Sequence, residues 1–364
     1  MIYEKIIRPI FFRFDPETIH HFVIKFLGLA ASLWPINFLI KKFLFVRSPV
    51  LKVKLGRIEL ENPVGLAAGF DKFMDAPQAY PMLGFGHAEL GSFTLKEQPG
   101  NPRPRLWRLP KDKALIVYYG LANCGIEKMK KLFLKLKVGG YPYGISIAPN
   151  NDLSPEEMVK NYFESYQQIY EEATYITLNV SCPNVAKCEL FAQINFIEDL
   201  LQKVSEFREL NNIQKDIFVK IGPDYDLAEL DKIIDLCLKY KLTGVVATNL
   251  VKKRDTIQPV STATELNHPG GISGKLLQQK SDKTIEHIYR RTRGALKIIG
   301  LGGIFTAEDA YRKIKLGANA VQVITGFIYE GPLMVRRLNR GLLKLLKKDN
   351  FKTLEEAVGS GVRN

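Results

Sequence analysis

Residues 175–184 concentrate groups that could do chemistry at the end of an apolar segment. Asn179 and Asn184 each carry a hydrogen-bond donor and an acceptor, which suits the edge of a planar amide or imide ring. Cys182 lies between them and could act as an acid or a base, because a free thiol has a pKa of about 8.5. Pro183 would end a strand here. The alternative is a strand followed by an Asn-Pro turn with a buried cysteine.

Two lysines and a third asparagine lie at or near the ends of other apolar segments. These are Lys72, Lys220 and Asn249. A lysine beside N1 and the C2 carbonyl of a flavin ring would stabilise the anionic reduced form of that ring. We therefore interpret these residues as a site for an electron-rich cofactor and a flat polar substrate. Either lysine could instead form a salt bridge at the rim.

The elements that must position these groups are short apolar strands alternating with helical segments. Apolar runs without alternation are typical of parallel strands that are buried on both faces. We predict strands at 63–67, 87–93, 144–148, 175–180, 217–221, 244–248, 297–301 and 320–325, and helices at 155–172, 196–210, 227–240, 281–292 and 307–316. Eight strands with intervening helices predict an α/β fold, a (β/α)8 TIM barrel. In such barrels the chemistry gathers at the C-terminal strand ends.

Two glycine-containing turns end the seventh and eighth predicted strands. They are Gly300-Leu-Gly-Gly-Ile304 and Thr325-Gly326. Barrels commonly bind phosphate at these two positions, because glycines let backbone N–H groups approach an anion. Two ordinary turns between a strand and a helix would have the same sequence. We predict a small hairpin at 51–60, and a Pro-rich excursion over one mouth of the barrel at 98–105.

Composition restricts the class of protein. The chain has 364 residues and no break in composition, which indicates one major domain with appendages. Its formal net charge of +14 fits an anionic substrate or membrane surface, whereas the absence of zinc spacing and of aromatic-interleaved basic blocks argues against nucleic acid. Four cysteines without paired spacing, and no secretory signal, indicate a reducing cytoplasmic compartment without disulfides.

The first 48 residues form a separate helical segment ahead of the barrel, which we place at 49–364. Asp15-Pro16 begins a helix, and the residues at 20–33 and 36–45 are unusually apolar for a surface. Lys25 and Pro35 interrupt the roughly 20 apolar residues that a spanning helix needs. We interpret the segment as short helices lying in a membrane interface. A helical cap packed on the barrel is the alternative.

Several motifs together resemble the dihydroorotate dehydrogenase family, and the match runs nearly end to end. They are Asn62-Pro-Val-Gly-Leu-Ala-Ala-Gly-Phe-Asp-Lys72, Gly100-Asn-Pro-Arg-Pro-Arg-Leu-Trp-Arg-Leu-Pro110, Val219-Lys-Ile-Gly-Pro-Asp224, Gly270-Gly-Ile-Ser-Gly274, Ile298-Ile-Gly-Leu-Gly-Gly-Ile304 and Tyr329-Glu-Gly-Pro332. The helical N-terminus and the Pro-Arg-rich excursion resemble the membrane-associated, quinone-using class 2 branch. The resemblance implies FMN as cofactor, oxidation of dihydroorotate to orotate in pyrimidine biosynthesis, and electron transfer to a quinone arriving between the N-terminal helices.

The resemblance also implies site residues. Those implied for FMN are Ala67, Ala68, Gly69, Ser92, Ser146, Asn179, Lys220, Thr248, Gly274, Gly303 and Thr325. Substrate contacts are implied for Lys72, Asn179, Asn184 and Asn249, and Cys182 occupies the position of the catalytic base. His20 and Arg108 match positions along the family's quinone route.

Three departures from the family pattern concern the substrate side. Cys182 stands where class 2 members have serine, as in the soluble class 1 enzymes, and a thiol is the better base at neutral pH. Val117 replaces a substrate-binding asparagine, with Asn123 or Tyr118 as possible compensation. The family's Gly-Lys-Asn is Ala148-Pro-Asn150 here, and its Pro-Gly-Leu-Arg is Ala186-Lys-Cys-Glu189.

The leading hypothesis is therefore an FMN-dependent, quinone-using dihydroorotate dehydrogenase bound peripherally to the cytoplasmic side of the cell inner membrane. One alternative is a paralogue with the same fold that acts on another dihydropyrimidine or an enone, with Val117 facing an apolar substituent. Another is a flavin-binding or membrane-associated protein without turnover, against which Lys72, Cys182 and Lys220 argue.

Overall fold

Eight parallel strands close into a barrel in the computed structural model, which describes residues 2–136, 139–151, 153–180 and 194–362. The order around the barrel is β10-β12-β13-β3-β4-β7-β8-β9. The strands are β3 (Val64–Leu66), β4 (His87–Phe93), β7 (Tyr143–Ile147), β8 (Tyr175–Asn179), β9 (Asp216–Ile221), β10 (Gly244–Ala247), β12 (Lys297–Leu301) and β13 (Ala320–Val323). The predicted TIM barrel is confirmed.

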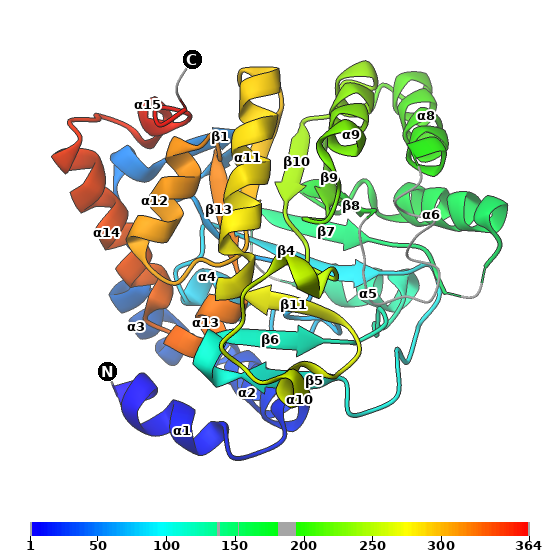
Figure 1. The fold of residues 1–364 in the computed structure, drawn as a ribbon. Coiled ribbons are helices and arrows are strands. Elements are labelled where there is room, and N and C mark those ends of the chain that lie inside the picture. Colours follow the sequence, from blue (N-terminus) through cyan, green and yellow to red (C-terminus); the bar gives the residue numbers. More distant parts are fainter. Residues whose placement is uncertain (1, 137–138, 152, 181–193, 363–364) are drawn as a thin grey trace.

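Helices cover much of the outside of the barrel, and the short α10 lies beside strands outside it (Figure 1). They are α4 (Ala79–Met82), α5 (Ile126–Phe133), α6 (Pro155–Ile169), α8 (Ile194–Leu210), α9 (Leu227–Lys239), α10 (Ala263–Leu266), α11 (Gln278–Thr292), α12 (Ala307–Lys315), α13 (Thr325–Glu330), α14 (Met334–Lys348) and α15 (Leu354–Ala357). Capping boxes start α6 at Ser154, α9 at Asp226 and α12 at Thr306. All five predicted helices are present. The eighth strand ends at Val323, two residues short of our prediction, because Thr325 already begins α13.

Glycines inside the barrel make room for large side chains from neighbouring strands. A Cβ on Gly65 would lie 2.2 Å from Nε2 of His87, and one on Gly144 would lie 2.1 Å from Cζ of Tyr175. Both rings are fully buried. Tight interdigitation of this kind fills the barrel interior, so that it is a packed core rather than a pore.

A three-stranded antiparallel sheet lies outside the barrel and was not anticipated from the sequence. Its order is β11-β6-β5, formed by β5 (Leu106–Leu109), β6 (Ala114–Val117) and β11 (Gly271–Gly274). Leu109, Ile116 and Ile272 pack into a small apolar cluster of their own. The predicted Pro-rich excursion leads into β5, and the predicted hairpin is present as β1 (Val53–Leu55) and β2 (Ile58–Leu60).

The N-terminal segment forms a π-helical turn (Tyr3–Ile7) followed by α1 (Arg8–Phe11), α2 (Pro16–Ser32) and α3 (Trp34–Leu44). Short 3-10 turns occur at Pro49–Leu51, Pro110–Asp112, Arg254–Thr256 and Lys275–Leu277. Asp15 caps α2 by accepting a hydrogen bond from the backbone N–H of Thr18 at 2.8 Å. In Figure 1 these blue helices lie beside β5 and α4, against which α2 packs.

The outer face of α2 and α3 carries large apolar side chains that are exposed. Phe22, Phe26 and Leu29 on α2, and Trp34 and Leu39 on α3, expose between 59% and 74% of their surface. Within the described residues no single helix is long and apolar enough to cross a membrane. Only α2 and α3 taken together meet that criterion, and the pair is bent by 102°.

Candidate active site

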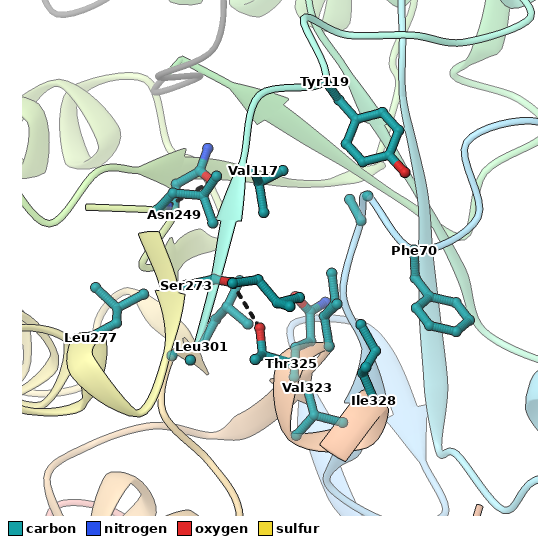
Figure 2. A pocket seen from close by; sticks show the side chains of 18 of the residues that line it. Phe70, Val117, Tyr119, Asn249, Ser273, Leu277, Leu301, Val323, Thr325 and Ile328 are labelled. Carbon is teal, nitrogen blue, oxygen red and sulfur yellow. Dashed lines mark hydrogen bonds between the residues drawn. The ribbon is translucent and has the colours of Figure 1, made fainter. Parts of the chain in front are cut away.

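A cavity at the C-terminal end of the barrel strands brings most of the predicted site residues together. It holds about 1240 Å³ of empty space, part of which is open to solvent, and β6 and β11 form one of its walls. Figure 2 shows Val117 and Ser273 of these strands at the cavity, with Ser273 directly beside Thr325. The lining of the cavity is mostly apolar with a small number of convergent polar groups, as is usual for small-molecule sites.

Twelve of the predicted residues line this cavity: His20, Ala68, Gly69, Lys72, Ser92, Asn179, Lys220, Thr248, Asn249, Gly274, Gly303 and Thr325. Three others, Ala67, Ser146 and Arg108, do not line it. Cys182 and Asn184 lie outside the described residues.

A chain of hydrogen bonds fixes the two described asparagines. Asn249 donates from Nδ2 to Oδ1 of Asn179 at 3.3 Å, and Asn179 donates from Nδ2 to Oγ of Ser92 at 2.9 Å. The hydroxyl of Ser92 lies 2.7 Å from that of Ser146. Ser146 is fully buried and does not line the cavity, so this hydrogen bond connects it to the cavity wall through Ser92. These bonds hold both amides in defined orientations at the cavity wall.

The turns predicted to bind phosphate have the geometry of a glycine cradle. Gly274 and Gly303 have φ angles of +98° and +70°, which side chains rarely tolerate. An added Cβ on Gly274 would lie 2.4 Å from the carbonyl oxygen of Lys113. Beside them, the hydroxyl of Thr325 lies 2.8 Å from that of Ser273 (Figure 2). Backbone therefore approaches the cavity at points where side chains would block it.

Two polar groups at the cavity fit a bound flavin. Oγ1 of Thr248 is buried and has no hydrogen-bond partner among the described residues, which leaves it available to a ligand. Lys220 is 4% exposed and brings a buried cation to the same cavity. A buried cation and an unsatisfied hydroxyl match the polar edge of a flavin ring. The glycine cradle provides room for its phosphate.

Lys72 lines the cavity in contact with an aromatic ring. Its Nζ is 3.9 Å from the ring centroid of Tyr119. Burial lowers the pKa of Lys72 to about 8, while Glu17 and Asp71 oppose that change and Arg105 adds to it. Near neutral pH the ammonium form is therefore still the major one, and it can bind a carboxylate.

His20 and Arg108, predicted together, occupy different environments. Nε2 of His20 lies 2.8 Å from the carbonyl oxygen of Phe70, and because a carbonyl only accepts, this nitrogen is the donor. Burial lowers the pKa of His20 to about 3, so the ring at the cavity is neutral. Arg108 instead donates to the carbonyl of Phe14 at 2.7 Å and lies over the ring of Phe12. It holds the N-terminal segment in place.

Val117 ends β6 and lines the cavity, whereas the two residues considered as compensation lie elsewhere. Asn123 is fully occupied, because its Oδ1 accepts from the backbone N–H groups of Thr94 and Gly125 and its Nδ2 donates to Thr94 and Leu121. Neither Asn123 nor Tyr118 lines the cavity. Tyr119, two residues after Val117, does line the cavity, and the sequence analysis did not single it out.

Comparisons with known proteins agree with this geometry. The model of the family described as dihydroorotate dehydrogenase matches residues 50–346. A protein of *Gloeobacter violaceus* named dihydroorotate dehydrogenase (quinone) is 40% identical over 356 residues, covering 98% of both chains. One with the same name from *Nostoc punctiforme* is 38% identical and covers 100% of this chain and 99% of its own.

The chain belongs to the dihydroorotate dehydrogenase family. A crystal structure of DHODH from *Eimeria tenella* in complex with ferulenol has a TM-score of 0.83 at 29% identity, covering 96% of both chains. The ligand-free form has a TM-score of 0.80 at the same identity, covering 92% of this chain and 99% of its own. The quinone-dependent names of the curated relatives support the class 2 branch. The comparisons give no support to the paralogue that Val117 had suggested.

Proposed function

We propose that this protein oxidises dihydroorotate to orotate, with FMN as its bound cofactor and a quinone as electron acceptor. Family membership and the names of the full-length relatives support the reaction. The observation that carries the proposal is the single cavity that combines a glycine cradle, a buried lysine and two oriented asparagines. The glycine cradle fits a phosphate, the buried lysine fits an electron-rich ring, and the two asparagines fit a flat polar substrate.

FMN would be held by the residues of the cradle and by Lys220, Thr248 and Ser92. When bound, the flavin supplies the two-electron acceptor for the substrate. The buried charge of Lys220 would favour a negative charge on the ring of a bound flavin, since the low local dielectric strengthens the attraction.

The protein side chains would do the remaining work on the substrate. Lys72 would bind the carboxylate, and Asn179 and Asn249, with Asn184, would hydrogen-bond the edges of the ring. Cys182 would remove a proton from the substrate carbon as general base. Because Asn179 is held by Ser92, it needs no reorientation when the substrate binds.

We further propose that residues 1–48 form the part of the molecule that associates with a membrane and admits the quinone, with the barrel at 49–364. The exposed apolar face of α2 and α3 supports peripheral association with a membrane, which we propose to be the inner membrane at its cytoplasmic side. Neutral His20, at the cavity wall and on α2, lies where a quinone passing between these helices would reach the site. Replacing Phe22 and Trp34 together by serine should weaken binding to phospholipid vesicles at least about 10-fold.

The test of the proposed function is steady-state turnover with dihydroorotate and alternative acceptors. The purified protein should reduce a soluble quinone analogue rapidly and should reduce neither NAD⁺ nor fumarate at a comparable rate. Preferential use of NAD⁺ or fumarate would contradict the quinone assignment. A protein that contains flavin but does not respond to dihydroorotate with any acceptor would contradict the substrate.

A further inference from the structure

Tyr119 is the residue of the cavity whose contacts the proposed reaction leaves unexplained. Its ring is 6% exposed, and its hydroxyl is buried with no hydrogen-bond partner among the described residues. Two cations contact the ring, Lys72 with Nζ at 3.9 Å from the centroid and Arg105 with Cζ at 4.9 Å. Two cations this close to one ring repel each other, and a negative charge beside them would offset that repulsion.

Glu17 of α2 supplies that negative charge. Its carboxylate is 2% exposed and accepts from Nη2 of Arg105 at 2.8 Å and from Nε at 3.2 Å. Arg103 also contacts it, at 3.1 Å. The forked arrangement of Glu17 and Arg105 is the strong geometry for an ion pair. The guanidinium is thereby neutralised locally, and the ammonium of Lys72 experiences less repulsion.

The Pro-rich excursion locks this unit in place. Nη1 of Arg105 donates to the carbonyls of Pro99 at 2.7 Å and Asn101 at 2.9 Å. The backbone N–H of Asn101 in turn donates to the carbonyl of Tyr119 at 3.0 Å. A Cβ on Gly100 would lie 2.2 Å from that same carbonyl oxygen, so the approach requires glycine. Arg105 therefore has no freedom to leave the ring.

We propose that Tyr119 is a positioning residue for Lys72, and that Glu17 and Arg105 complete the unit, so that helix α2 is coupled to the lysine that binds the substrate carboxylate. This inference rests on the proposed function. In Figure 2, Tyr119 lies at the end of the cavity near Phe70 and away from Asn249, so its ring defines the lysine end of the site. The ring attracts the ammonium through its negative face and keeps it directed into the cavity.

The experiment compares Tyr119→Phe, which keeps the ring, with Tyr119→Leu, which removes it. Tyr118→Leu is the matched control, since Tyr118 neighbours Tyr119 but does not line the cavity. In Tyr119→Leu the KM for dihydroorotate should rise about 10-fold, which lies between the effects of an exposed and of a fully desolvated cation–π contact. The kcat and the flavin content should stay close to those of the parent. Tyr119→Phe and Tyr118→Leu should both retain the parental KM.

Glu17→Gln tests the same unit from α2. Lys72 is surrounded by Glu17 and Asp71, which favour its charged form, by Arg105, which disfavours it, and by neutral His20. Removing the charge of Glu17 lowers the pKa of Lys72, so the alkaline fall in kcat/KM should begin at a lower pH than in the parent. A profile measured from about pH 6 to about pH 10 would reveal this displacement.

The outcomes separate this inference from the proposed function. If the unaltered protein is reduced by dihydroorotate but Tyr119→Leu keeps the parental KM, the inference is wrong and the function stands. If Tyr119→Phe raises KM as much as Tyr119→Leu, the hydroxyl and not the ring is responsible, which also overturns it. An unchanged pH profile in Glu17→Gln refutes the link to α2. If the unaltered protein does not respond to dihydroorotate, the proposed function itself has failed.

Discussion

Replacing Gly303 by alanine should weaken the binding of FMN, because the substitution strains a turn of the proposed cofactor site. Gly303 has a φ of +70°, a conformation that costs a residue with a side chain about 1–2 kcal/mol. The new Cβ would also lie 2.5 Å from Cβ and 2.7 Å from Cα of Gln278. Backbone at the start of α11 cannot move aside cheaply, so overpacking adds about 1–3 kcal/mol.

The two contributions together reach about 2–5 kcal/mol, and the turn can relieve them only by moving away from its observed position. Since that turn forms part of the proposed phosphate cradle, we expect the strain to appear as weaker binding of FMN. A loss of 2 kcal/mol corresponds to an increase of about 30-fold in Kd. Titration of the flavin-free protein with FMN, followed by flavin fluorescence, would measure it.

Two other glycines provide matched controls. Gly294 has a φ of +83° but ample space, and it does not line the cavity. Gly294→Ala should therefore lower stability without changing the affinity for FMN. Gly139 has no atom within 4 Å of an added Cβ, and Gly139→Ala should change neither by more than about 0.5 kcal/mol. If Gly303→Ala binds FMN as tightly as Gly294→Ala does, the turn is not the cofactor cradle.

Three further predictions concern the substrate side. Burial lowers the pKa of Lys72 to about 8, so its charge is lost as the pH rises through that value, and orotate binding should weaken there. Lys72→Met should abolish this pH dependence of orotate binding. Titrations followed by flavin absorbance can show both effects. Cys182→Ala should slow reduction of the bound flavin at least about 100-fold. Cys237→Ala, at a buried thiol of α9, is the control. If Cys182→Ala reduces its flavin at the parental rate, the thiol has no part in the mechanism. Val117→Asn should lower the KM for dihydroorotate at least about 5-fold by restoring a hydrogen bond, and an unchanged KM would show that the substrate does not reach β6.

The barrel was predictable because parallel strands buried on both faces appear in the sequence as apolar runs. The bounds of β4 and β12 matched the prediction at both ends. The C-terminal ends of β8, β9 and β10 then placed Asn179, Lys220 and Thr248 around one cavity without any long-range information. Fold and polar site were therefore accessible from local pattern and the known geometry of barrels.

The sheet formed by β5, β6 and β11 was not predictable in the same way. Val117 pairs with Gly271, and neither segment of four residues indicates its distant partner. The same limit applies to Arg105 and Glu17, whose ion pair joins the excursion to α2. Their contact depends on how α2 packs, which hydrophobic periodicity does not determine.

The most direct measurement of the central claim is anaerobic reduction of the bound flavin by dihydroorotate, followed by its reoxidation with a quinone. We expect the visible flavin absorbance to disappear on addition of dihydroorotate, with formation of one orotate per flavin, and to return when the quinone analogue is added. Flavin that stays oxidised in excess dihydroorotate, in a protein that dithionite reduces, would contradict the assignment.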